Sequence, residues 1–553
     1  MLKTIVCLST LWVAVHAAPS GIPGPVAHVR NGTYVGVRND HYKQDFFLGM
    51  SYAQQPTGDL RFTVPQSLNR SWDGMRDAKE YSEICVGYGT DSIWYPMSEA
   101  CLTLNVVRGS SADENSNLPV GVWIHGGGFY MGSGSDQRYN MSAIVDNSYK
   151  IGKPFIAVSL NYRVSAWGFL GSSEVTDSGN TNLGIRDQRL ALQWIKENIQ
   201  AFGGDPDKIT IWGESAGAIS VGLHLTAYGG RDDGLFRGAI MESGGSISAR
   251  PMNSTGYQAM YDDVVAKVNC TGSEDTLQCL REVPFEDLNA VFNGTDGDPV
   301  YQFWPAVDND LVTGPGSVQL DNHEFIKVPI LAGTNTDEGV SFGPTGINTT
   351  EQFYAYLTDG SSGFKLPPAV ANQILDLYPD DPSQGIPGFL GDQRVPSKGY
   401  QWRRTSAYGG DYAMHANRRR QCEAWAAATT TAYCYRFNMR GADVPYLSGA
   451  DHFEEVAFVF NNIAGLGYHY GKPFEGMPES YHQLSTLMAS MWASFIHDLD
   501  PNSGIKDEVR WQAYGDQPVD LVFDANVTSY MEPDTWRKEG IDYINSNARV
   551  YWR

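Results

Sequence analysis

The chain has few basic residues and few cysteines for its length. Its 553 residues include 40 Lys and Arg against 63 Asp and Glu, for a formal net charge of −23. Because phosphate groups are bound by basic surfaces, this shortage argues against a nucleic-acid partner. It also argues against electrostatic docking on anionic membranes. Beyond residues 1–17 no apolar run is long enough to cross a bilayer, so we expect no stable membrane insertion.

The composition that remains is typical of a globular protein with a large core. Apolar residues make up 42% of the chain and aromatic residues 12%. At roughly 100–200 residues per domain, the length permits three or four domains. It also permits one large α/β domain with insertions.

Residues 1–17 have the pattern of a secretory signal peptide. Lys3 precedes a mostly apolar run from Ile5 to Val15, and small residues follow before Ala18. A buried first helix is the alternative. Cleavage would remove Cys7 and leave six of the seven cysteines, an even number that suits an oxidising compartment. We therefore expect a secreted protein whose mature chain begins at residue 18.

Glycosylation is expected on surface loops of such a protein. Eight N-x-S/T sequons begin at Asn31, Asn69, Asn140, Asn253, Asn269, Asn293, Asn348 and Asn526.

Short apolar runs alternate with longer helical patterns along the chain. The runs that predict buried strands are residues 120–124, 155–160, 208–212, 236–241, 328–331 and 432–437. Helical patterns cover residues 184–202, 218–225 and 484–498. This alternation favours an α/β fold with a large parallel-rich sheet and helices on both faces. We expect residues 250–420 to form helical excursions, and the basic run Arg418–Arg420 to lie on a solvated helix face.

A serine lies where a predicted strand meets a predicted helix. The sequence Gly213-Glu214-Ser215-Ala216-Gly217 follows the strand at 208–212 directly. A G-x-S-x-G at this position is typical of a nucleophile elbow, which lifts the serine hydroxyl clear of the sheet. We therefore predict that Ser215 is a nucleophile.

A serine nucleophile needs a base, and the base needs an acid that orients it. In this architecture the acid follows the serine in the chain, usually just after a strand. Asp337 and Glu338 both follow the strand at 328–331, and spacing does not choose between them. The downstream histidines are His415, His452, His469, His482 and His497. His452 lies in a glycine-containing loop, which suits a mobile base better than His497 on a helix.

Glycines after another predicted strand are candidates for the oxyanion hole. Gly126-Gly127-Gly128 ends the strand at 120–124, and His125 precedes it. Such a run lets backbone N–H groups approach a substrate carbonyl, and a further donor would be the N–H of Ala216. A flexible turn is the alternative reading of these glycines.

Taken together, these motifs resemble the type-B carboxylesterase/lipase family of the α/β-hydrolase fold. The stretch from Phe202 to Gly217 matches the long serine signature of the family. Cys101-Leu102-Thr103-Leu104-Asn105-Val106 matches its second signature, although Ala100 replaces the usual acidic residue before the cysteine. The resemblance runs from about Ala27 to the C-terminus, so residues 18–553 are expected to form one catalytic domain similar to secreted fungal esterases and lipases.

The resemblance implies roles for the candidate residues. It places the acid of the triad on Glu338, the base on His452, and the oxyanion donors on Gly127, Gly128 and Ala216. The implied function is hydrolysis of small-molecule carboxylic esters through an acyl-enzyme, without metal or organic cofactor. Alternatives are a triacylglycerol lipase, an amidase or peptidase, and a non-catalytic adhesion protein on the same fold. Phe129, Phe303 and Trp304 are candidates for the substrate pocket.

The six remaining cysteines pair most simply in chain order, as Cys85–Cys101, Cys270–Cys279 and Cys422–Cys434. Spacing alone does not prove this pairing. The first two pairs resemble disulfides of the family, whereas the third has no such support. In lipases of the family the first disulfide bounds a long mobile lid, but here only Val86–Ala100 lies between the cysteines. This short loop favours an esterase without strong interfacial activation.

Overall fold

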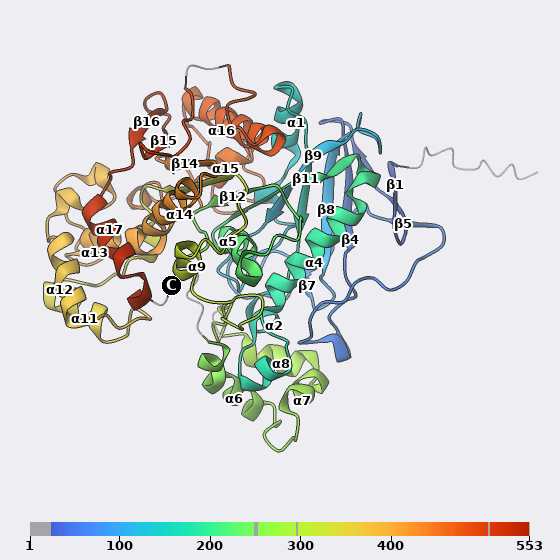
Figure 1. The fold of residues 1–553 in the computed structure, drawn as a ribbon, viewed down its shortest axis with the longest axis horizontal. Helices are drawn as coiled ribbons and strands as arrows, with labels where there is room; N and C mark the ends of the chain where they lie inside the picture. The colour runs from blue at the N-terminus through green and yellow to red at the C-terminus, as the bar shows by residue number, and fades with distance from the viewer. Residues whose placement is uncertain (1–23, 248–252, 295–296, 507–508, 552) are drawn as a thin grey trace, which may run out of the picture.

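A large mixed sheet runs through the centre of the protein, as a computed structural model shows (Figure 1). The structure describes residues 24–247, 253–294, 297–506, 509–551 and 553. The predicted signal peptide, residues 1–17, lies outside the described residues.

Eleven strands of the described chain form this sheet, in the order β16-β15-β14-β13-β12-β11-β9-β10-β8-β4-β3. Their bounds are β3 (Val37–Asn39), β4 (Gln44–Ser51), β8 (Thr103–Gly109), β9 (Leu118–Ile124), β10 (Ile156–Leu160), β11 (Gly204–Glu214), β12 (Gly238–Glu242), β13 (Ile330–Asn335), β14 (Ala432–Phe437), β15 (Val519–Phe523) and β16 (Tyr530–Pro533). Every neighbouring pair from β10 through β15 is parallel. The antiparallel pairs lie toward the two edges of the sheet. They are β10–β8, β8–β4 and β4–β3 on one side and β15–β16 on the other.

The predicted strands are confirmed in the parallel part of the sheet, where apolar runs are buried on both faces. In β9, Val122 belongs to the core cluster on one face and Trp123 to the cluster on the other. This alternation follows the two-residue period of a strand. The carboxyl ends of the parallel strands meet at one edge, where the loops that carry the site begin.

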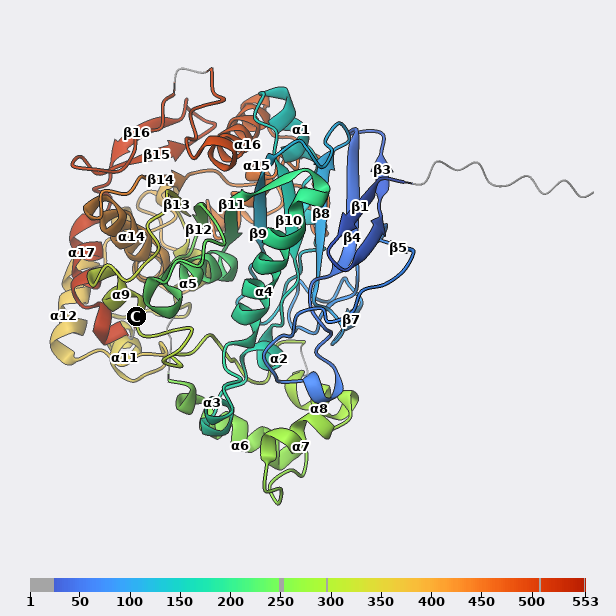
Figure 2. The same cartoon turned by 45° about the vertical axis from the view of Figure 1, so that its right-hand side comes forward.

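Helices cover both faces, as the two views together show (Figure 1, Figure 2). One face packs against α4 (Leu183–Asn198), α5 (Ala216–Gly230) and α14 (Ala416–Ala427). The other packs against α1 (Ser142–Lys150), α15 (Val456–Val459) and α16 (Glu479–Asp498). The helical patterns predicted from the sequence at 184–202, 218–225 and 484–498 therefore correspond to α4, α5 and α16.

The remaining helices form two groups outside these layers. One lies at the bottom of Figure 1, with α6 (Gln258–Lys267), α7 (Thr276–Glu282) and α8 (Phe285–Phe292). The other packs around its own apolar cluster, with α11 (Thr350–Thr358), α12 (Pro368–Leu377), α13 (Trp402–Gly410) and α17 (Lys538–Ser546). Short helices are α2 (Ser165–Phe169), α3 (Ser173–Asp177), α9 (Gly316–Asp321) and α10 (Gly339–Phe342). Within the described ranges, none of the helices is both long and apolar enough to cross a membrane.

The described residues also contain two small sheets. One has the order β1-β2-β5, with β1 (Val26–Val29), β2 (Gly32–Val35) and β5 (Met75–Asp77). The other pairs β6 (Ile84–Cys85) with β7 (Met97–Ser98).

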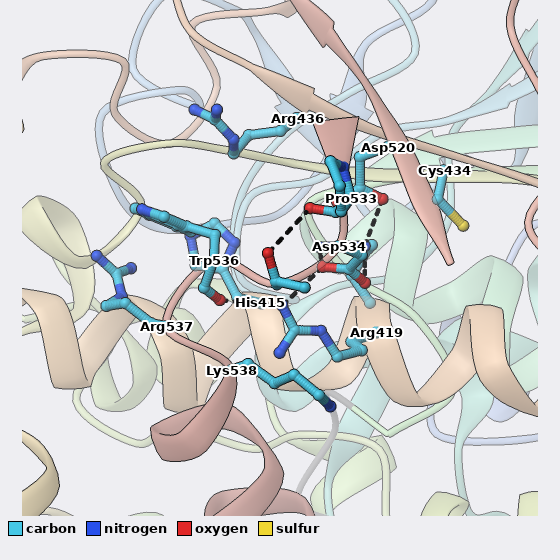
Figure 3. A network of polar contacts seen from close by, with 12 residues as sticks. His415, Arg419, Cys434, Arg436, Asp520, Pro533, Asp534, Trp536, Arg537 and Lys538 are labelled. Atoms are coloured by element: carbon cyan, nitrogen blue, oxygen red, sulfur yellow. Dashed lines mark hydrogen bonds and ion pairs between the residues drawn. The ribbon is translucent and has the colours of Figure 1, made fainter. Parts of the chain in front are cut away.

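The prediction of a solvated helix face at Arg418–Arg420 is wrong for its first two residues. Arg418 is 3% exposed and Arg419 1% exposed. Arg418 Nη1 lies 2.6 Å from Asp520 Oδ1 and 2.8 Å from Asp534 Oδ2. Figure 3 shows Asp534 between Arg419 and Asp520. Both aspartates lie about 100 residues further along the chain, so the sequence pattern around the arginines does not reveal their partners.

The three predicted disulfides, Cys85–Cys101, Cys270–Cys279 and Cys422–Cys434, are present. Residues 86–100 contain turns and the short strand β7 but no helix.

Candidate active site

Ser215 occupies a sharp turn between β11 and α5. β11 ends at Glu214 and α5 begins at Ala216. Ser215 has φ 54° and ψ −124°, a strained conformation with positive φ that costs a non-glycine residue about 1–3 kcal/mol. A Cβ at Gly217 would collide with the carbonyl oxygen of Ile124 at the end of β9. The glycine therefore lets the helix approach the sheet closely enough to hold the strained turn.

Two hydrogen bonds connect Ser215 with the predicted base and acid. The Oγ atom of Ser215 lies 2.8 Å from Nε2 of His452, and Nδ1 of His452 lies 2.8 Å from Oε2 of Glu338. Glu338 is fully buried, and its Oε1 accepts a hydrogen bond of 2.8 Å from the N–H of Asn335. The three side chains come from three separate loops at the carboxyl ends of β11, β13 and β14.

Asp337, the other acid candidate, has a different environment. Its Oδ2 accepts a hydrogen bond of 2.9 Å from the N–H of Ala450. Burial raises the pKa of Asp337 to about 6, against lowering by that hydrogen bond and nearby arginines. Asp337 thus holds the loop that carries His452, whereas Glu338 contacts the imidazole itself.

The predicted oxyanion donors lie at the neighbouring strand end. Gly127 and Gly128 follow β9 with φ angles of 92° and 61°, conformations that favour glycine. Within the part of the chain that the structure describes, nothing accepts a hydrogen bond from the backbone N–H groups of Gly127, Gly128 or Ala216. These donors are available to a ligand beside Ser215.

Three further buried carboxyl groups surround this centre, and the sequence analysis did not identify them. They are Glu214, Glu242 and Glu455, each no more than 1% exposed. Oε1 of Glu214 lies 3.2 Å from Nε2 of His452. Oε1 of Glu242 accepts hydrogen bonds of 2.5 Å from the indole N–H groups of both Trp212 and Trp492. Glu214 and Glu242 are the last residues of neighbouring parallel strands. A carboxyl group at that position in the sequence would have indicated that both belong to the site.

Burial governs the protonation of this group. It raises the pKa of Glu214 and of Glu242 well above the ordinary value, and it raises that of Glu455 to about 7. For His452, burial acts to lower the pKa, but Glu214 and then Glu338 outweigh it and raise the pKa to about 10. Glu214 and His452 compete for a proton across this short distance. When Glu214 holds the proton, its carboxyl group is neutral and no longer raises the pKa of His452.

The predicted pocket residues lie in apolar packing. Phe129 is fully buried, and its ring packs 5.2 Å from Phe169 and 5.6 Å from Trp304 between centroids. Phe303 is 1% exposed and packs against Tyr257. The structure thus brings Phe129 and Trp304 together and places Phe303 in the core.

A cavity of about 300 Å³ is lined in part by His452. Its walls come from the Cys85–Cys101 loop, from residues 136–138, and from the segment between β14 and α16. Phe129, Phe303 and Trp304 do not line it. Among the described residues, no three His, Cys, Asp or Glu side chains are arranged to hold a metal ion.

Comparison with known proteins places these features in a family. Residues 23–533 match the sequence model of the carboxylesterase family. Secreted lipase 1 of Botryotinia fuckeliana is 32% identical over 97% of this chain and 94% of its own length. The secreted triacylglycerol lipase of Gibberella zeae is 30% identical over 94% of this chain and 90% of its own.

Among solved structures, EstA of Aspergillus niger matches with a TM-score of 0.83 at 29% identity, covering 96% of this chain and 99% of that chain. The chain therefore belongs to the carboxylesterase family and is a carboxylic ester hydrolase with the α/β-hydrolase fold.

Proposed function

We propose that the protein is a secreted serine carboxylesterase in which Ser215, His452 and Glu338 form the catalytic triad. The observation that supports this most strongly is the pair of 2.8 Å hydrogen bonds from Glu338 through His452 to Ser215. A nucleophile, a base and an orienting acid in this order are what acyl transfer requires.

In the first half of the reaction, Ser215 Oγ attacks the ester carbonyl carbon while Nε2 of His452 takes the hydroxyl proton. Glu338 accepts the hydrogen bond from Nδ1 and so keeps Nε2 unprotonated before attack. It also stabilises the imidazolium that forms.

The negative charge then develops on the former carbonyl oxygen. The N–H groups of Gly127, Gly128 and Ala216 donate to that oxygen, and each such donor contributes about 3–4 kcal/mol of barrier lowering in comparable sites. The helix α5 starts directly behind Ser215, so its N-terminal dipole acts in the same direction.

Collapse of the intermediate releases the alcohol, which takes its proton from Nε2 of His452. Water then attacks the acyl-enzyme, with His452 again accepting the proton, and the acid leaves. All bonds made and broken in this cycle involve the chain, the ester and water.

The substrate class is a carboxylic ester of modest size. The absence of a helix from residues 86–100 supports an esterase without strong interfacial activation. Triacylglycerol lipase activity is the second candidate, because the relatives of Botryotinia fuckeliana and Gibberella zeae are named as lipases.

Secretion and a single domain belong to the same proposal. Two relatives are named as secreted proteins, and three disulfides suit an oxidising compartment. Of the eight sequons, Asn31 and Asn140 are half-buried and the other six are exposed. We expect glycans at the exposed positions and a mature chain, residues 18–553, that folds as one unit.

A p-nitrophenyl ester series from acetate to palmitate tests the assignment, with Ser215→Ala as control. The proposal expects highest turnover on short chains and no activity in Ser215→Ala. Activity that survives Ser215→Ala contradicts the triad. A maximum at long chains, with a jump above the solubility limit, contradicts the esterase in favour of the lipase.

A further inference from the structure

A second cavity, of about 390 Å³, lies beside the loop that carries His452. Gly449 and Ala450 of that loop line it together with Asp337. It shares no lining residue with the cavity at His452, and neither Ser215 nor the oxyanion donors line it. Its volume lies within the range of small-ligand sites, about 300–1,000 Å³. The cavity is therefore separate from the active site and large enough for a compact ligand.

Two exposed aromatic rings belong to the lining of this second cavity. Phe389 is 49% exposed and Tyr446 62% exposed, and their rings meet edge to face with centroids 4.8 Å apart. The face of an aromatic ring is apolar and carries the negative part of its quadrupole. Aliphatic C–H groups next to oxygen, such as those of a sugar ring, have a partial positive charge and pack well against such a face.

A buried acceptor in the same lining lacks a donor. Asp337 is 4% exposed, and its Oδ2 accepts the hydrogen bond from the N–H of Ala450. Its Oδ1 is also buried, yet among the described residues no group donates a hydrogen bond to it. Because an unsatisfied buried acceptor is costly, this atom indicates a ligand that brings a hydroxyl or amide donor.

The charges in this lining favour an uncharged ligand. The lining contains one acidic and one basic side chain, Asp337 and Arg440. The guanidinium group of Arg440 lies 5.7 Å from the ring centroid of Tyr446, and its Nη1 donates to the carbonyl oxygen of Val444 at 3.0 Å. With one charge of each sign, the cavity gives neither a cation nor an anion a net attraction. Exposed rings, a free acceptor and balanced charge together fit a neutral sugar.

The chain itself has an attachment point for a sugar in this lining. Asn526 lines the cavity and begins the sequon Asn526-Val527-Thr528, in the exposed turn between β15 and β16. Its Nδ2, the atom to which an N-linked glycan is joined, lies 3.8 Å from Sδ of Met439. Met439 lines the cavity as well. A glycan on Asn526 therefore begins at the cavity.

We propose that Asn526 carries an N-linked glycan whose first sugar rings occupy this cavity, where they pack against Phe389 and Tyr446 and donate a hydrogen bond to Asp337. The inference rests on the proposed secretion of the protein, and it adds a bound position for one of the expected glycans. The sugar then packs against the loop that carries His452, since Asp337, Gly449 and Ala450 belong to the same lining.

The test measures how fast a peptide N-glycosidase releases each glycan from the folded full-length protein, secreted by a yeast host. The enzyme converts a glycosylated asparagine to aspartate, so peptide mass spectrometry follows each sequon separately. Asn69 is the reference, because it is exposed and does not line the cavity. Two ring contacts should slow release at Asn526 by roughly tenfold or more relative to Asn69. After reduction and denaturation the two rates should be similar.

Variants of the ring wall make the test specific to the cavity. Tyr446→Leu should speed release at Asn526 by roughly threefold to tenfold, the range of a single aromatic contact, and Phe389→Leu should act in the same direction. Tyr446→Phe keeps the ring and should keep the protection.

Val527→Ala is the matched control, because Val527 is 57% exposed on the same turn, does not line the cavity and leaves the sequon intact. It should keep the wild-type rate. Equal release at Asn526 and Asn69 in the folded wild type overturns the inference. So does an unchanged rate at Asn526 in both Tyr446→Leu and Phe389→Leu.

Failure of the underlying proposal has a different signature. Thr528→Ala should remove one glycan from the intact mass and Thr528→Ser should keep it, which assigns that glycan to Asn526. If other exposed sequons carry glycans and Asn526 does not, the inference alone is overturned. If no sequon carries a glycan, the proposed secretion fails together with the inference.

Discussion

The protein contains two buried clusters of charged side chains, and they are built on opposite principles. In the first, which we call the α14 cluster, Arg418 and Arg419 form ion pairs with Asp520 and Asp534. Figure 3 shows Arg419 and the two aspartates. Cations and carboxylates are equal in number, and the arginines hold the pKa of Asp534 far below its ordinary range against the effect of burial. Such a cluster links α14 to the last strands of the sheet.

The second, which we call the carboxylate cluster, comprises Glu214, Glu242, Glu338 and Glu455. Among the described residues that contact these four side chains, His452 is the sole basic group. Burial therefore raises the pKa of Glu214, Glu242 and Glu455, in contrast to Asp534.

The contrast distinguishes buried charged groups that stabilise the fold from buried charged groups that take part in chemistry. Removing one partner of a buried ion pair destabilises the protein, because the other charge is left buried without a counter-charge. A buried group of like charges retains protons, and perturbed groups of this kind occur preferentially at functional sites.

Glu338→Gln should lower kcat by about 10³–10⁴-fold with little loss of stability. The amide side chain no longer fixes the imidazole tautomer or stabilises the imidazolium, and an equivalent change in another triad has an effect of this size. Steady-state kinetics on p-nitrophenyl acetate measures it. Asp337→Asn is the control and should keep kcat within about tenfold. The reverse order would assign the acid to Asp337.

Asp534→Asn should reduce the free energy of unfolding by about 3–5 kcal/mol, because it leaves Arg418 and Arg419 buried without a full counter-charge. Urea denaturation with the disulfides intact measures the loss, and kcat of the folded protein should stay unchanged. Asp146→Asn removes only the exposed pair with Lys150 and should cost less than about 0.5 kcal/mol. A loss below about 1 kcal/mol in Asp534→Asn would show that the α14 cluster is not a stabilising unit.

The two clusters should respond to pH in opposite directions. The pKa of Glu242 is raised in the folded state, so its contribution is full below the unfolded pKa and is lost as pH rises through the folded one. Glu242→Gln should therefore become more stable relative to wild type as pH rises above about 4.3, by at most about 1.4 kcal/mol per pH unit.

The pKa of Asp534 is depressed, so its contribution is present above the unfolded pKa and is lost as pH falls through the folded one. The difference between wild type and Asp534→Asn should therefore shrink below about pH 3.9. Urea denaturation at a series of pH values measures both differences. If the difference in unfolding free energy between wild type and either variant does not change with pH, the pKa of that carboxyl group is not shifted in the folded state.

Glu214→Gln should shift the acid limb of the kcat/KM profile to lower pH, the smallest of the four effects. The carboxylate of Glu214 is the main group that raises the pKa of His452, and His452 must be neutral to accept the proton of Ser215. Without that carboxylate the imidazole stays neutral at lower pH. A pH–rate profile with one ester measures the shift, and a shift to higher pH would mean that Glu214 does not act on His452.

Much of the fold is predictable from the sequence because local patterns carry it. Residues 120–124 and 209–212 are buried on both faces of the sheet, so their sequences are rich in apolar and β-branched residues and predict strands. The position of Ser215 is predictable for the same reason, because Gly213 and Gly217 indicate a turn at which strand and helix pack closely. Cys422 and Cys434 pair as neighbours in the chain, which requires no knowledge of the tertiary structure.

Features that depend on distant partners are not predictable in this way. Arg418 contacts residues 102 and 116 positions away, so its sequence neighbourhood indicates an exposed helix. The choice between Asp337 and Glu338 depends on which carboxyl group lies within hydrogen-bond distance of His452. Spacing along the sequence does not determine that distance. The cavity beside His452 arises only when the loop with Trp94 meets the segment with His469.

The most direct test of the account is to find the atom that is acylated. Treatment with a fluorophosphonate, which mimics the tetrahedral intermediate, followed by intact mass and peptide mass spectrometry identifies the nucleophile. We predict one adduct per chain, located on Ser215, with parallel loss of esterase activity and no adduct in Ser215→Ala. An adduct on another residue, or esterase activity that survives full modification of Ser215, would contradict the account.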